Sequence, residues 1–197
     1  MKTKNNFNIS DFKAIVIGVS AGGFEALTKL FSTLPKDFPL PIIVVQHIHK
    51  YQSGYLFEHL NKHCALKVKE ADEKETIKPG NIYFAPPNYH LLIEEDKTFS
   101  LSVDEKVNYS RPSIDVLFKC AAEVYKNQLI GIILTGANDD GAEGMRIIKE
   151  NGGLTIAQDP RDAEFPVMPQ SAIDKVEIGI ILTLENLTFH FSGWHRK

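Results

Sequence analysis

The sequence predicts an α/β fold, a doubly wound and mostly parallel sheet flanked by helices (Rossmann-like), with a small antiparallel hairpin. Short apolar runs rich in β-branched residues alternate with helical patterns along most of the 197 residues, which is typical of such a sheet. The first two runs enclose a helix of about ten residues, so they form a βαβ unit whose strands are parallel. Hydrophobic residues make up 43% of the chain, enough for a substantial core.

A glycine-rich turn organises the first elements. Residues 14–17 are expected to form a buried strand, and Gly18, Gly22 and Gly23 lie in the turn that follows. These glycines remove the β-carbons that would crowd a tight strand-to-helix turn. A helix is expected from residue 24 to about residue 34.

The later elements continue the alternation. The expected strands cover residues 41–47, 66–71, 80–85, 128–134, 154–157 and 179–182, and the expected helices cover 51–62, 111–125, 142–150, 168–173 and 184–191. Residues 90–94 and 98–102 flank a polar turn and are expected to pair as the hairpin. The stretch from residue 66 to residue 102 looks more antiparallel than the two ends of the chain.

Composition narrows the class of protein. Residues 1–12 are expected as a polar leader and residues 13–197 as a single domain. A formal charge of −3 and a pI near 6.2 give no sign of nucleic-acid binding. Without a membrane-length apolar run or a signal peptide, a cytoplasmic protein with no membrane insertion is expected. Cys64 and Cys120 have no paired spacing, which argues against a disulfide framework or a cysteine-based zinc site.

Ser20 lies in the glycine-rich turn, where three interpretations compete. Gly-x-Ser-x-Gly is the pattern of a nucleophile elbow, in which N–H groups at the start of the next helix stabilise a developing oxyanion. A dinucleotide-binding loop would have glycine at position 20 and an acidic residue at the end of the second strand, and the chain has neither. The third interpretation is a structural turn with a helix-capping serine. The turn alone leaves the first and third open.

Two further strand ends carry residues that would complete a catalytic triad. Carboxyl ends of parallel strands lie along one edge of a sheet, so His47 is expected close to Ser20. Asp139 and Asp140 follow the strand over 128–134. A serine needs a base within hydrogen-bond reach, and that base needs a carboxylate to fix its tautomer. This chemistry requires no cofactor.

Six motifs then follow one another in a fixed order from about Lys13 to Leu187, nearly the whole chain. They read Gly-Val-Ser20-Ala-Gly-Gly, Val-Val-Gln-His47, Phe-Ala-Pro-Pro-Asn-Tyr-His90-Leu, Arg111-Pro-Ser-Ile-Asp-Val-Leu-Phe, Thr-Gly-Ala-Asn-Asp-Asp140-Gly-Ala-Glu-Gly, and Thr-Ile-Ala-Gln158-Asp with a following Met-Pro-Gln-Ser-Ala-Ile. In this order they resemble the catalytic domain of the bacterial chemotaxis protein-glutamate methylesterases, the CheB family. Six ordered motifs are far more specific than one elbow.

The resemblance implies a function and three roles. In that family the serine is the nucleophile, the histidine of Gln-His is the base, and the aspartate before glycine orients the base. These roles fall on Ser20, His47 and Asp140. The implied reaction is hydrolysis of glutamate methyl esters on methylated cytoplasmic helices of chemoreceptors, with release of methanol and sometimes with glutamine deamidation.

Further site residues are implied, and one loop departs from the family pattern. Ala21 and Ala137 are the implied oxyanion positions, and Arg111 could either bind an acidic group near the ester or form a salt bridge at the helix start. The family's loop usually reads Thr-Gly-Met-Gly-x-Asp-Gly, whereas here Ala137 and Asn138 replace Met and Gly. A backbone N–H at Ala137 could still serve the oxyanion, and asparagine tolerates left-handed backbone, so Asn138 is expected to keep the turn.

The regulation of this module and its exact function can be interpreted in more than one way. Family members commonly carry an N-terminal receiver domain, but only about a dozen residues precede the first strand here. A stand-alone catalytic module without built-in phospho-control is therefore expected. A non-catalytic receptor-binding module of the same fold and an esterase for small molecules remain as alternatives.

The other histidines suggest weaker hypotheses. An α/β-hydrolase order would use Ser20, Asp140 and His190, but the elbow here follows the first strand and His190 falls in an expected terminal helix. His47-Ile-His49 could place two imidazoles on one face, yet no third ligand is signalled, so no metal site is expected. His90 is expected to have a structural or substrate-edge role.

Overall fold

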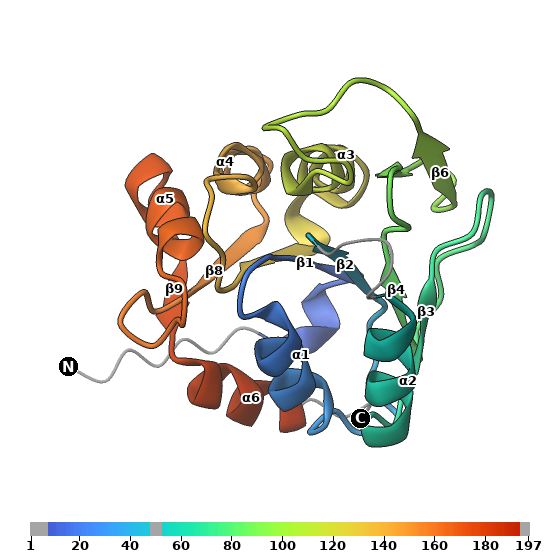
Figure 1. Cartoon of the computed structure of the whole chain (residues 1–197), viewed down its shortest axis with the longest axis horizontal. Coiled ribbons are helices and arrows are strands. Elements are labelled where there is room, and N and C mark those ends of the chain that lie inside the picture. The colour runs from blue at the N-terminus through green and yellow to red at the C-terminus, as the bar shows by residue number, and fades with distance from the viewer. Residues whose placement is uncertain (1–7, 48–52, 194–197) are drawn as a thin grey trace.

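The computed structural model describes residues 8–47 and 53–193 of the chain. At its centre is a seven-stranded sheet with the strand order β3-β4-β2-β1-β7-β8-β9, in which all neighbours are parallel (Figure 1). The strands are β1 (Ala14–Val19), β2 (Ile42–Gln46), β3 (Lys67–Glu70), β4 (Asn81–Phe84), β7 (Leu129–Ile133), β8 (Leu154–Gln158) and β9 (Ile180–Leu182). The predicted doubly wound parallel sheet is confirmed.

Helices cover both faces of the sheet (Figure 1). One face carries α1 (Gly23–Phe31), α2 (Ser53–His63) and α6 (Leu184–Ser192), and the other carries α3 (Ile114–Tyr125), α4 (Ala142–Glu150) and α5 (Val167–Lys175). The predicted antiparallel hairpin, β5 (His90–Ile93) with β6 (Phe99–Ser102), packs on the same side as α3. Within the described ranges, no helix has both the length and the apolar character needed to cross a membrane.

Each face of the sheet has its own hydrophobic core. All six residues of β1 are buried, because helices cover this central strand on both sides. Its side chains alternate between the two cores: Ile15 and Ile17 pack on the side of α1, and Ala14 and Val16 pack on the side of α3. A continuous apolar run is the expected signature of such a strand.

Within residues 66–102, which look more antiparallel than the ends of the chain, only the hairpin is an antiparallel pair of strands, and the expectation does not hold for β3 and β4. These strands pair in parallel within the main sheet, and the connection between them contains no helix. That connection instead lies along the hairpin, where the N–H groups of Lys74 and Ile77 donate to hairpin carbonyls at 2.8 and 3.0 Å. In the edge strand β3 only Val68 is fully buried. Its sequence therefore alternates in polarity as an antiparallel strand would.

The winding of the sheet reverses at β1, which lies between β2 and β7. Val19 is in register with Gln46, so Ser20 and His47 follow directly at the same edge of the sheet. Ligands of open α/β sheets bind at this edge, beside the point where the strand order reverses. The candidate site is therefore at the carboxyl ends of β1, β2 and β7.

Candidate active site

The turn after β1 holds Ser20 through its backbone. The N–H of Ser20 donates to the carbonyl of Thr135 at 3.0 Å, and the carbonyl of Ser20 accepts the N–H of Gly23 at 3.0 Å. Gly22 adopts left-handed backbone with a φ of 75° and takes the N-cap position of α1, without a side-chain hydrogen bond. The helix therefore begins without a side-chain cap, and the interpretation of Ser20 as a capping residue is not observed.

His47 follows β2 and contacts the carboxylate of Asp140. The backbone N–H of His47 donates to the last carbonyl of β1 at 3.2 Å, which brings the residue next to the Ser20 turn. Nε2 of the imidazole lies 3.0 Å from Oδ2 of Asp140, and the carboxylate is fully buried while the imidazole is 15% exposed. Asp139 is exposed. Asp140 therefore pairs with His47, whereas His190, the histidine of the rival order, lies on α6.

Asp140 is surrounded by hydrogen-bond donors at the start of α3. Besides His47, its carboxylate accepts the N–H of Ile114 at 2.8 Å, the hydroxyl of Ser113 at 2.9 Å and the N–H of Asp115 at 3.1 Å. An additional amide, that of Asn108, donates at 3.3 Å. The positive end of the helix therefore faces this carboxylate.

These contacts affect the ionisation of two neighbouring carboxyl groups. Burial by itself would raise the pKa of Asp140, but hydrogen bonds from His47, from the start of α3 and from Ser113 outweigh burial and lower that pKa below its ordinary value. The opposite happens at Asp115, where burial raises the pKa to about 6 although Gly144 donates an N–H to it. An ionised Asp140 can only accept, so Nε2 of His47 carries the hydrogen between them.

Asn138 contacts the other ring nitrogen. Its Nδ2 lies 3.3 Å from Nδ1 of His47, and its Oδ1 accepts the N–H of Asp140 at 3.3 Å. The turn expected at Asn138 does not use left-handed backbone there: Asn138 has no positive φ, and the left-handed residue of this loop is Gly141, with a φ of 98°. The side chain of Asn138, which sequence reasoning did not consider, is what reaches the site.

The two candidate oxyanion positions lie in loops that are tied together. The Thr135 hydroxyl donates to the carbonyl of Ala21 at 3.0 Å and accepts the N–H of Phe165 at 2.9 Å. Gly136 donates its N–H to the carbonyl of Phe165 at 2.9 Å, and Ala137 follows it as an exposed residue. The hydrogen bond from Thr135 to Ala21 therefore links the turn after Ser20 to the loop after β7, and the two bonds with Phe165 hold that loop from its other side.

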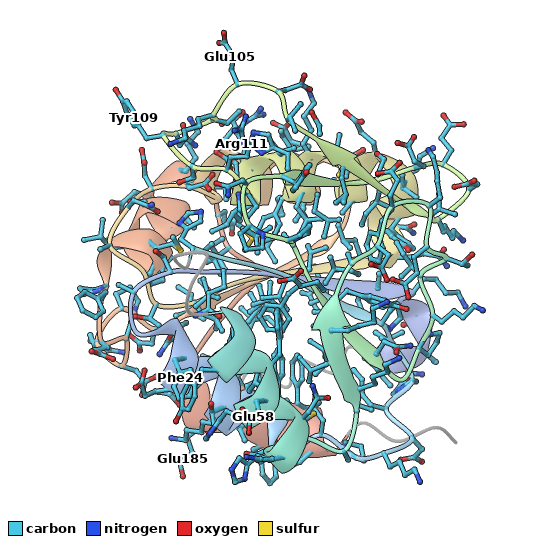
Figure 2. The ribbon with its side chains drawn as sticks, turned by 45° about the vertical axis from the view of Figure 1, so that its right-hand side comes forward. Phe24, Glu58, Glu105, Tyr109, Arg111 and Glu185 are labelled. Atoms are coloured by element: carbon cyan, nitrogen blue, oxygen red, sulfur yellow. The ribbon has the colours of Figure 1, made fainter. Side chains whose placement is uncertain are left out.

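Arg111 and His90 both hold the loop that leads into α3. Nη1 of Arg111 donates to the carbonyls of Val103 and Asp104 at 2.6 and 2.8 Å, and within the described residues Arg111 forms no ion pair. His90 is buried, with Nε2 3.0 Å from the carbonyl of Glu105 and Nδ1 accepting the N–H at the N-cap of α3. These contacts favour the structural one of its two expected roles. Glu105 projects outward from this loop, and Arg111 lies closer to the body (Figure 2).

Metal and thiol chemistry receive no support in the part of the chain that the structure describes. It contains no group of three or more His, Cys, Asp or Glu side chains that could hold a metal ion. His49, the second histidine of His-Ile-His, lies outside the described residues. Cys64 and Cys120 are free, and burial raises the pKa of the Cys120 thiol to about 12, which makes it a poor nucleophile.

A histidine–carboxylate pair beside a serine turn, at the switch point of a doubly wound sheet, is an arrangement typical of serine ester hydrolases that are built on such sheets. The model of one such family, CheB methylesterase, matches residues 15–190. The chain therefore belongs to the CheB methylesterase family.

Similar proteins cover nearly the same region. A relative from Leptospira interrogans is 58% identical over 177 residues, which are 90% of this chain and 92% of that protein. A protein of Clostridium acetobutylicum named protein-glutamate methylesterase/protein-glutamine glutaminase is 33% identical, over 93% of this chain and 53% of its own length. The crystal structure of the Thermotoga maritima CheB methylesterase catalytic domain matches with a TM-score of 0.87 and 36% identity, over 92% of this chain and 97% of that one.

Proposed function

We propose that this chain hydrolyses methyl esters of glutamate side chains on the cytoplasmic helices of chemoreceptors and deamidates glutamine by the same route. The names of its relatives support this reaction. The observation that carries it for this chain is the 3.0 Å contact between Nε2 of His47 and Oδ2 of buried Asp140, beside the Ser20 turn. Such a substrate would place the protein in the cytoplasm.

Ser20 is the nucleophile in the proposed mechanism. As its Oγ attacks the ester carbonyl, Nδ1 of His47 takes the hydroxyl proton, and Asp140 stabilises the imidazolium through Nε2. His47 then protonates the departing methoxide, methanol leaves, and an acyl-enzyme joins Ser20 to the glutamate side chain. Water attacks this acyl group with the imidazole again as base, which releases the carboxylate and restores Ser20.

The oxyanion of each tetrahedral intermediate requires donors in fixed positions. We assign the backbone N–H groups of Ala21 and Ala137 to this role. The hydrogen bond from the N–H of Gly23 to the carbonyl of Ser20 supports the assignment, because that carbonyl and the N–H of Ala21 belong to the same peptide group. The N-terminus of α1 adds a favourable dipole at the same turn.

We place Arg111 at the edge of the substrate site. It lines a cavity of about 500 Å³ together with Glu70, Tyr89 and the Pro86-Pro87 turn. Two carbonyls already hold its Nη1. Arg111 therefore positions substrate chiefly by shaping the wall of this cavity.

Methanol release from a methyl-esterified receptor fragment tests the proposal. The purified chain is expected to release methanol, and Ser20→Ala is expected to fold normally and lose activity by a factor on the order of 10⁴ or more. A serine-directed phosphonate should label Ser20 in the parent protein. Labelling that persists in Ser20→Ala would contradict the assignment.

Two other outcomes would point to other functions. A chain that binds the fragment but releases neither methanol nor ammonia would be a receptor-binding module. A chain that hydrolyses only small soluble esters would be a small-molecule esterase. Each result would be separable from misfolding by the circular dichroism of the same sample.

A further inference from the structure

The two ring nitrogens of His47 have different partners. Nε2 faces Oδ2 of Asp140 at 3.0 Å, and Nδ1 faces Nδ2 of Asn138 at 3.3 Å. The side chain of Ser20, in contrast, makes no hydrogen bond to any residue in the described ranges 8–47 and 53–193. In the substrate-free protein, Asn138 therefore occupies the nitrogen that the proposed mechanism reserves for the serine proton.

The orientation of the Asn138 amide follows from its second contact. The backbone N–H of Asp140 is a donor, and it lies 3.3 Å from Oδ1 of Asn138, which is an acceptor. The amide nitrogen must then point toward the imidazole. Exchanging the oxygen and nitrogen would set two N–H groups against each other at Asp140.

The protonation of the ring agrees with this orientation. Asp140 is ionised and can only accept, so the hydrogen of a neutral imidazole lies on Nε2. Nδ1 then presents a lone pair, and the Asn138 amide donates to it. The chain of hydrogen bonds Asn138–His47–Asp140 is satisfied at every step, and it holds the ring in the tautomer that can accept a proton from Ser20.

We propose that Asn138 is a positioning residue that covers the base nitrogen of His47 in the resting enzyme and yields it to Ser20 when the ester binds. This inference rests on the proposed function, because it assumes that His47 acts as the base. A neutral hydrogen bond has a modest net strength, so substrate binding can displace it. Until then the serine stays weakly nucleophilic and water is less readily activated.

Kinetics of Asn138→Ala test the displacement. The free enzyme no longer has to release Nδ1, so kcat/KM for the methyl-esterified fragment should rise about three- to tenfold. The substrate-bound enzyme has already made that exchange, so kcat should change little and the gain should appear in KM. A merely structural residue would give the opposite pattern, a lower kcat with unchanged KM, and that pattern would overturn the proposal.

Asn138→Asp is a matched variant of nearly the same shape. It keeps the oxygen that accepts the N–H of Asp140 but cannot donate to Nδ1. The new carboxylate accepts where the amide donated, so with Asp140 on Nε2 it favours a hydrogen on Nδ1, the nitrogen that must take the serine proton. At neutral pH kcat/KM should therefore fall, opposite in sign to the alanine variant. Asp139→Ala, exposed in the same loop, should leave kcat/KM within about twofold.

Nitrogen NMR of the His47 ring separates this inference from the proposed function. In the substrate-free protein the Nδ1 resonance should show a hydrogen-bonded lone pair, and in Asn138→Ala it should move to the position of a free lone pair. This measurement needs no turnover. If the wild type released no methanol, the proposed function would fail while the NMR result still decided the contact. An Nδ1 resonance that is identical in both proteins would overturn the inference.

Discussion

At the scale of single residues, Asp140 serves two structures at once. It accepts the hydrogen of His47, and it also accepts two N–H groups from the first turn of α3. Ser113 occupies the N-cap position of that helix, but its hydroxyl makes no capping hydrogen bond and donates to Asp140 instead. A carboxylate from another loop therefore caps α3, and these bonds fix the position of Asp140 relative to the start of the helix.

The two adjacent aspartates should respond differently to the same substitution. Asp140→Asn should lower turnover by a factor on the order of 10⁴, because the amide favours the wrong tautomer of His47. The new residue also presents one oxygen where two accept now, so the melting temperature should fall. Asp139→Asn, at an exposed position, should keep turnover within about tenfold.

Both variants can be compared on one methylated substrate, with melting followed by circular dichroism. A larger loss of turnover from Asp139→Asn would show that the wrong aspartate has been assigned.

The two candidate histidines give a second comparison. His47→Ala should cost about as much turnover as Ser20→Ala, because members of a triad act as a unit. His190 lies on α6, so His190→Ala should change only the stability of the folded protein. Methanol release by the two purified variants, at equal folded concentration, distinguishes them. The reverse result would favour the α/β-hydrolase order.

At the scale of elements, a glycine in β1 lets α3 approach the sheet. A Cβ built on Gly18 would lie 2.4 Å from Cγ2 of Ile114, the first residue of α3. The same isoleucine lies 2.7 Å from a Cβ built on Gly141. The N–H of Ile114 is a donor to Asp140, so the close packing of strand and helix and the geometry of the site depend on the same residue.

Gly18→Ala should therefore affect both stability and activity. Overpacking at this contact should lower the free energy of unfolding by about 1–3 kcal/mol. It should also lower turnover, since displacement of Ile114 moves a donor away from Asp140. Gly54→Ala is the control, because no residue that the structure describes lies within 4 Å of its Cβ position and α2 should gain helix propensity. Denaturant unfolding and methanol release measure the two effects, and a Gly18→Ala protein with full stability would contradict this account.

The succession of strands and helices was predictable because burial leaves a clear period in the sequence. β7 and the first four residues of β2 form continuous apolar runs, and α4 begins at Ala142 and ends at Glu150 as expected. Element ends were less predictable, since α1 ends at Phe31 rather than near residue 34. The parallel pairing of β3 with β4 could not be predicted, because an edge strand exposed on one face alternates like an antiparallel strand.

The candidate site was predictable to the level of strand ends and no further. Parallel strands bring their carboxyl ends to one edge, so Ser20, His47 and Asp140 could be grouped from the sequence alone. Spacing does not encode the rotation of an imidazole, so neither the partner of each nitrogen nor the contact with Asn138 followed from it. The cap that Asp140 provides for α3 joins residues 26 positions apart and required the fold.

At the scale of the whole molecule, the sheet gathers three helix starts near one site. α1 begins just after Ser20, α3 begins at the carboxylate of Asp140, and α4 begins just after Asp140 in the chain. Helix N-termini favour negative charge. This arrangement supports an ionised Asp140 in a buried position, but it leaves Asp115 as a second, poorly solvated carboxylate beside it.

The dependence of folding stability on pH should reveal Asp115. Its pKa is raised to about 6 from an ordinary value of 3.8, so between about pH 4 and pH 6 the folded protein binds more protons than the unfolded chain. The contribution of Asp115 to stability must then fall as pH rises through that window. Asp140, whose pKa is lowered, acts in the opposite sense and loses its contribution only as pH falls below its ordinary value.

Asp115→Asn removes the titration and keeps an oxygen for the N–H of Gly144. The stability of this variant relative to the wild type should therefore rise as the pH increases from about 4.5 and level off above about 7. Any hydrogen bond to Asn108 that the substitution disturbs would shift the whole curve without changing its slope. Denaturant unfolding of both proteins across this range measures the difference. A difference in unfolding free energy that is constant with pH, or that falls as pH rises, would contradict this account. It would mean that Asp115 is ionised at least as readily in the folded protein as in the unfolded chain.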